Sequence, residues 1–140
     1  MHSIDNLLES SVGARADLSS LISEAQNGTI GINEARDRIA GVISQRTSLQ
    51  TQVAALDPPG PFAYSARLLS QSIAASLDDD RAIQGMINAY LDGSDPSYFI
   101  SQHEEATSSA TNAKRQFLTV YNRARSRYLK LAPLSLDLRY

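Results

Sequence analysis

The sequence predicts an all-α fold, an antiparallel up-down-up-down four-helix bundle in which the third and fourth helices are long. Apolar residues recur at helical three- and four-residue spacing along most of the 140-residue chain. Pro and Gly clusters interrupt this pattern and leave only short connections, which favour antiparallel neighbours. The hydrophobic content of 42% suffices for a single core. We therefore expect one domain over residues 1–133.

The first two helices are predicted at about residues 3–26 and 33–56. Asn27-Gly28 is a typical C-terminal stop for the first of them. The run Asp57-Pro58-Pro59-Gly60-Pro61 must end the second, because consecutive prolines remove backbone donors and push the preceding residue out of the helical region. Eight positions form the stripe of the second helix, and all except Arg46 are apolar: Ile32, Ala35, Ile39, Val42, Arg46, Leu49, Val53 and Leu56.

The third and fourth helices are predicted at about residues 61–91 and 96–131. The apolar stripe of the third helix continues through Asp78-Asp79-Asp80, so we expect one long helix with an irregularity near Asp80 and a solvated acidic face. Asp95 followed by Pro96 is typical of a helix start. After Pro133 the pattern changes to two-residue alternation, which predicts an extended C-terminal tail over residues 134–140. The tail can pack on the bundle or on another molecule, so monomer and homodimer both stay open.

Several classes of chemistry lack their residues. There is no cysteine, which excludes a disulfide scaffold and a thiol nucleophile. His103 is not part of a Glu-x-x-His metal motif, because position 100 is Ile, and we expect it to be packed or hydrogen-bonded instead. The glycines form neither a phosphate-binding loop nor a dinucleotide-binding turn. We therefore predict a protein that is not an enzyme, with no catalytic, cofactor-binding or metal-ligating residue.

Three polar residues interrupt the apolar stripes: Arg46 in the second helix, Asp80 in the third and His103 in the fourth. A buried charge is costly unless it is paired, so their positions matter. Aligning the helices by their turns places Asp80 near the level of Thr107 and does not bring it into contact with Arg46. The favoured expectation is that these side chains extend to solvent at the bundle edge. A convergent polar pocket is the alternative.

Charge is distributed unevenly along the chain. The formal net charge is −2, yet residues 111–140 carry seven basic residues and one acidic residue. Arg123, Arg127 and Lys130 follow i, i+4 and i+7 spacing on one face of the predicted fourth helix, which can bind a phosphate, a lipid head group or a nucleic acid. The negative net charge and the lack of a known DNA- or RNA-binding motif argue against nucleic acid. Basic residues also favour a helix C-terminus through its dipole.

Over residues 30–130 the order of features resembles a widespread group of uncharacterised bacterial extracytoplasmic helical domains, which usually follow a signal or membrane anchor. The resemblance rests on four elements: Ile43-Ser44-Gln45-Arg46, Leu56-Asp57-Pro58-Pro59, Ser76-x-x-Asp79-Asp80-Arg81 and Phe117-Leu118-x-x-Tyr121-Asn122-x-x-Arg125. The chain departs from the group in having no Trp in the third helix and no anchor. The resemblance implies a location outside the cytoplasm and marks Arg46, Asp79, Asp80 and Asn122 as candidate binding residues.

Two functional hypotheses follow. The first is a non-catalytic interaction or ligand-sensing module for a protein or small molecule, extracytoplasmic and either secreted or attached through a membrane anchor outside the given chain. The second is a cytoplasmic adaptor or regulator that binds an anionic partner through Arg123, Arg127 and Lys130. Neither hypothesis calls for a cofactor.

Overall fold

The computed structural model describes residues 2–58 and 60–129, and these ranges form four α-helices and one short π-helix. The α-helices are α1 (His2–Gln26), α2 (Ile32–Ala54), α3 (Gly60–Asp92) and α4 (Ser97–Ala124). The π-helix η1 (Arg125–Leu129) continues α4 without a break. The predicted all-α class, the four helices and the great length of α3 and α4 are confirmed.

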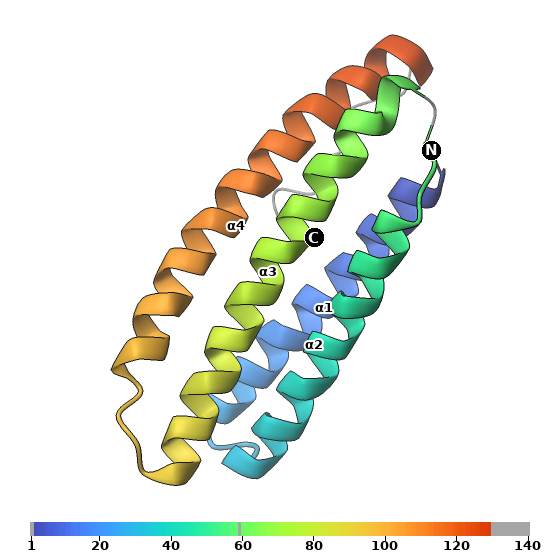
Figure 1. Ribbon diagram of the computed structural model, residues 1–140. Coiled ribbons are helices and arrows are strands. Elements are labelled where there is room, and N and C mark those ends of the chain that lie inside the picture. Colours follow the sequence, from blue (N-terminus) through green and yellow to red (C-terminus); the bar gives the residue numbers. More distant parts are fainter. Residues whose placement is uncertain (1, 59, 130–140) are drawn as a thin grey trace.

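The helices lie side by side along one long axis, as two hairpins (Figure 1). The blue-to-teal hairpin of α1 and α2 packs against the green-to-orange hairpin of α3 and α4. Helix α3 packs most extensively on α4 and then on α2, whereas α1 packs chiefly on α2. Helices α1 and α4 contact each other much less, so the seam between them is more open.

The turns that end α1 and α3 use glycines in the left-handed region. Gly28 has a φ of 72° and Gly93 has a φ of 70°, a conformation that costs a residue with a Cβ but not glycine. After each turn the chain bonds back to its helix: the Thr29 N–H donates to the Glu24 carbonyl at 2.9 Å, and the Ser94 N–H to the Ala89 carbonyl at 2.8 Å. Both stops follow from local sequence.

Three details of the helices differ from the predictions. Helix α3 runs unbroken through Asp80, because the carboxylates of Asp79 and Asp80 find partners on neighbouring helices rather than disturbing the backbone. Helix α4 begins at Ser97, whose backbone N–H and hydroxyl both donate to the Asp95 carboxylate. Its α-helical geometry ends at Ala124 rather than near residue 131. The predicted tail over residues 134–140 lies outside the described residues.

The apolar core consists of two clusters. The first lies between the N-terminal half of α1 and the C-terminal half of α4, and the second lies near the α1–α2 turn. Members of the first include Leu8, Leu49, Leu69, Leu77 and Phe117, and members of the second include Leu18, Leu21, Ile39, Val42 and Ile83. On α2 the two clusters are separated by Arg46 and on α3 by Asp80, so a buried polar layer divides the core.

Helices α3 and α4 approach closely near their connecting turn. A Cβ at Gly85 would lie 2.2 Å from Cδ1 of Phe99, far inside normal contact, so the Phe99 ring packs directly on the glycine backbone.

In the described part of the chain, no helix has the length and hydropathy required to cross a membrane.

Candidate functional site

Arg46 and Asp80 form a buried ion pair in the middle of the bundle. Arg46 is one turn from Val42 and Leu49 on the apolar stripe of α2, and helical periodicity points all of them into the core. Each of the two charged residues is only 1% exposed, and Arg46 Nε lies 2.7 Å from Asp80 Oδ2. The expectations that they do not touch and that they extend to solvent are both wrong. Ideal helices aligned by their turns did not capture the stagger between α2 and α3.

The three aspartates of the acidic run have three different environments. Asp78 is exposed and 3.9 Å from Arg81, as expected for a solvated face. Asp79 and Asp80 are buried, which corrects that expectation for two of the three residues. Asp79 bonds His103 Nδ1 on α4, so the predicted hydrogen-bonded role of His103 is confirmed. Consecutive helical residues point about 100° apart, and this lets Asp79 contact α4 while Asp80 contacts α2.

Two further cations complete what we call the charge cluster, namely Arg15, Arg46, Asp79, Asp80 and Lys114. Lys114 is 6% exposed on α4, and Arg15 belongs to α1. All four helices therefore contribute. Lys114 was not among the predicted site residues, although its spacing on α4 gives a signal. Five buried residues follow one another there at four- and three-residue intervals: Ala110, Lys114, Phe117, Tyr121 and Ala124.

The charge cluster surrounds a small cavity of about 60 Å³. A water needs on the order of 10–15 Å³ of such space, so the cavity has room for a few waters or for a group of carboxylate size. The lining comes from every helix: Arg15, Arg46, Ser76, Asp79, Asp80, Thr107, Ala110, Thr111 and Lys114. The cavity is thus a polar pocket inside the bundle, the alternative that the sequence left open.

Several buried polar atoms at this pocket lack a hydrogen-bond partner among the described residues. They are Arg46 Nε and Nη1, both carboxylate oxygens of Asp80, and Ser76 Oγ. Arg46 Nε is close to Asp80, but its N–H does not point at the carboxylate, so the ion pair lacks a hydrogen bond there. Buried groups of this kind are rare in native proteins, because each forfeits its hydration without compensation.

Burial shifts the ionisation of the cluster. Loss of hydration raises the pKa of Asp80 to about 6, against the opposing effect of Arg46. Loss of hydration, reinforced by Arg46 and Arg15, lowers the pKa of Lys114 to about 8. Desolvation likewise lowers the pKa of Arg46. The charged forms of Asp80, Lys114 and Arg46 are therefore less favourable here than in water.

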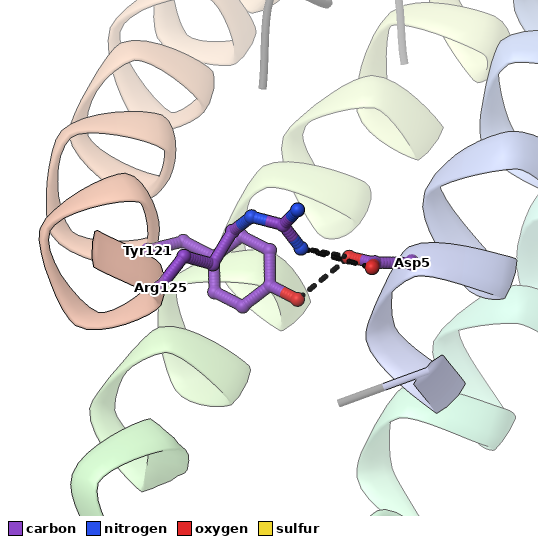
Figure 2. A network of polar contacts seen from close by, with 3 residues as sticks. All are labelled: Asp5, Tyr121 and Arg125. Carbon is purple, nitrogen blue, oxygen red and sulfur yellow. Dashed lines mark hydrogen bonds and ion pairs between the residues drawn. The ribbon is translucent and has the colours of Figure 1, made fainter. Parts of the chain in front are cut away.

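A second polar network, the terminal clamp, joins the start of α1 to the end of α4 (Figure 2). The Tyr121 hydroxyl donates to Asp5 Oδ1 at 2.7 Å, and Arg125 Nη1 donates to both Asp5 oxygens at 2.9 Å. The Tyr121 ring is fully buried and stacks on Phe117 at a centroid distance of 5.2 Å. Sequence reasoning did not select Asp5, because nothing in one sequence pairs residues 116 positions apart.

The remaining predicted binding residues that the structure describes do not join the charge cluster. Asn122 is half-buried, eight residues beyond Lys114 and so about 12 Å further along α4. Arg123 is exposed. Arg127 is exposed with its guanidinium over the Tyr128 ring, and it lies in the π-helical segment η1 rather than in α4. Lys130 lies outside the described residues.

Among the described residues, no three His, Asp or Glu side chains are grouped so that they could hold a metal ion. Comparison of the chain with protein-family models, with curated proteins and with solved structures found no match in any of the three.

Proposed function

We propose that this protein is a non-catalytic ligand-sensing module that binds a small anion at the charge cluster. The observation that carries the proposal is Arg46, a guanidinium 1% exposed, with two nitrogens that lack a hydrogen-bond partner beside a polar cavity. An anion in this cavity accepts hydrogen bonds from Arg46 and from the Ser76 hydroxyl. Arginine is well suited to this role, because its planar group matches a carboxylate or phosphate.

The charge balance of the pocket supports an anion rather than a cation. Three cationic side chains (Arg15, Arg46 and Lys114) face two carboxylates. One of these carboxylates, Asp79, is already bonded to His103. The raised pKa of Asp80 makes its negative charge easier to neutralise, which further favours a negative ligand.

The cost of the cluster also supports a function. Replacing a buried ion pair by apolar residues is often neutral or stabilising, so such a pair is weak evidence for a role in stability. Polar groups that break the local rules of core packing are typical of functional sites. A purely structural reading, in which ordered water satisfies the same atoms, is the competing explanation.

Thermal unfolding in added salts separates these readings. We expect sodium formate and sodium acetate to raise the Tm saturably above the Tm in sodium chloride at matched ionic strength, because a ligand that binds only the folded state stabilises it by mass action. Equal Tm values in all three salts would contradict the proposal and favour the structural reading.

The alternative proposal is a cytoplasmic adaptor that binds an anionic partner through its basic face. Its support is the exposure of Arg123 and Arg127 near the C-terminal end of α4 and in η1. This function predicts binding to anionic vesicles or polyphosphate that falls steeply with salt and falls again in Arg123→Glu/Arg127→Glu. The charge-cluster function predicts that the double variant binds formate as the wild type does.

We further propose an extracytoplasmic location, on the strength of the resemblance described above. Fractionation of cells that produce the native gene product with a C-terminal tag tests it. The proposal predicts the tagged protein in the envelope or secreted fraction. Recovery in the cytosol would overturn it and would give priority to the basic face of α4.

A further inference from the structure

A second cavity lies next to the charge cluster, nearer the α1–α2 turn. Its volume is about 430 Å³, within the range of small-molecule sites in proteins. Eight of its ten lining residues are apolar, and all four helices contribute: Leu21, Ile22, Ala25, Gln26, Ile32, Ala35, Ile83, Met86, Ile87 and His103. We call it the apolar cavity. Most of its lining residues belong to the second core cluster or pack against it.

The two cavities share a wall. His103 lines the apolar cavity, and its Nδ1 bonds Asp79, which lines the polar pocket. On α3, Ile83 in the apolar cavity is one turn from Asp79 and Asp80, so the linings are contiguous along that helix. The His103 side chain is 37% exposed. On the α3–α4 side the wall is therefore this hydrogen-bonded pair at the edge of the bundle. On α1 and α2 the buried side chains of Leu18, Ile39 and Val42 lie between the two linings.

Resting on the proposed function, we propose that the ligand is an amphipathic organic acid, with its anionic group in the polar pocket and its apolar body in the apolar cavity. The three cationic side chains select the sign of the head group, and the aliphatic lining selects the body. A ligand of this shape lies along the seam between α1 and α4, past the His103–Asp79 pair. Both halves of the site are then used by one molecule.

The size and the charge of the two cavities favour a small acid over a partner helix in this seam. A helix placed in a groove needs anchor positions spread over several turns. Here the polar pocket is about 60 Å³ and the apolar cavity about 430 Å³, which suits one compact head group and one short chain. A neutral apolar molecule would fill the second cavity and leave the unpartnered nitrogens of Arg46 without an acceptor.

The test is a homologous series of straight-chain carboxylates, from acetate to decanoate, titrated against the full chain by calorimetry. Each methylene that enters the apolar cavity is expected to tighten the Kd by about fourfold, which corresponds to about 0.8 kcal/mol per buried methylene. The gain should stop when the cavity is full. 1-Octanol is the matched neutral probe and is expected to bind at least tenfold more weakly than octanoate.

A cavity-filling variant locates the chain. Ala25→Leu adds volume at the half-buried wall of the apolar cavity, and Ala16→Leu adds the same volume at an exposed position of α1. We expect Ala25→Leu to weaken octanoate at least tenfold and leave acetate unchanged, and Ala16→Leu to change neither. Circular dichroism of both variants checks the fold.

The outcomes separate this inference from the proposed function. Acetate binding with no gain from longer chains would overturn the inference and leave the anion site standing. Octanol and octanoate binding equally well, with no acetate binding, would overturn both, because the charge cluster would then contribute nothing. No binding across the whole series would also overturn both.

Discussion

The terminal clamp and the charge cluster both join a carboxylate to an arginine across two helices, yet the two are built differently. In the clamp, Arg125 Nη1 donates to both oxygens of Asp5 at 2.9 Å, and the Asp5 side chain is 30% exposed. Only Nε of Arg125 is buried there without a hydrogen-bond partner among the described residues. In the cluster, Arg46 and Asp80 are almost fully buried, and their close contact does not satisfy their polar atoms.

This difference distinguishes a network that stabilises the fold from one that is suited to binding a ligand. The clamp keeps hydration on one side and makes short, well-directed bonds, so removing a partner should cost roughly the value of those bonds. In the cluster, Arg46 and Asp80 give up hydration and keep polar atoms without a hydrogen-bond partner among the described residues. We infer that the clamp stabilises the fold. The cluster lowers the stability of the fold and forms a pocket between the two apolar core clusters.

The largest expected effect is at Arg46. Arg46→Met leaves the Asp80 charge buried without its partner and should lower the free energy of unfolding by about 3–5 kcal/mol. Arg46→Met/Asp80→Leu removes both charges and should recover most of this loss or exceed wild-type stability. Urea unfolding at pH 7 measures both. A double variant as unstable as the single one would show that the pair itself stabilises the bundle.

A smaller effect is expected at the terminal clamp. Asp5→Ala removes the acceptor for both Tyr121 and Arg125 and should cost about 1.5–3 kcal/mol, as for hydrogen bonds to a charged group. Tyr121→Phe removes one of these bonds and should cost about 1 kcal/mol. Unlike the cluster, the clamp should not recover when Arg125→Met is added to Asp5→Ala. A recovery above wild type would make the two networks alike.

The smallest effect is the pH dependence of the cluster. Burial raises the pKa of Asp80 to about 6, so the folded state binds a proton more tightly than the unfolded state does. Its contribution to stability is full below the unfolded pKa near 4 and is lost as pH rises through 6. Relative to Asp80→Asn, the wild type should gain on the order of 1 kcal/mol as pH falls from 7 to 5. Urea titrations at several pH values measure this difference, and a constant difference would contradict it.

The fold could be predicted from the sequence because its determinants are local. The stripe that contains Ile39, Val42 and Leu49 repeats at helical spacing, and Gly28 and the Pro58 region end helices through their own backbone preferences. The change to π geometry after Ala124 was not predicted, because no local signal for it was recognised.

The site was predicted only in part, because it depends on how the helices are placed relative to one another. Arg46 and Asp80 were recognised as polar interruptions, but their contact depends on the stagger of α2 against α3, which sequence spacing does not give. Lys114 was not recognised as buried, because the next residue, Arg115, is also basic and is exposed. Asn122, Arg123 and Arg127 were proposed from a resemblance and a charge pattern, and their positions near the end of α4 and in η1 keep them apart from the pocket.

Lys114→Met gives the most direct test of the proposal that the charge cluster destabilises the fold and binds an anion. Desolvation lowers the pKa of Lys114 to about 8, so its charged form is disfavoured, and a neutral side chain of similar length should raise the Tm. The variant should also lose the extra Tm gained in acetate, whereas Arg115→Met, at the exposed neighbouring position, should change neither. A Lys114→Met protein that is less stable than the wild type and still gains Tm in acetate would contradict both parts of the proposal.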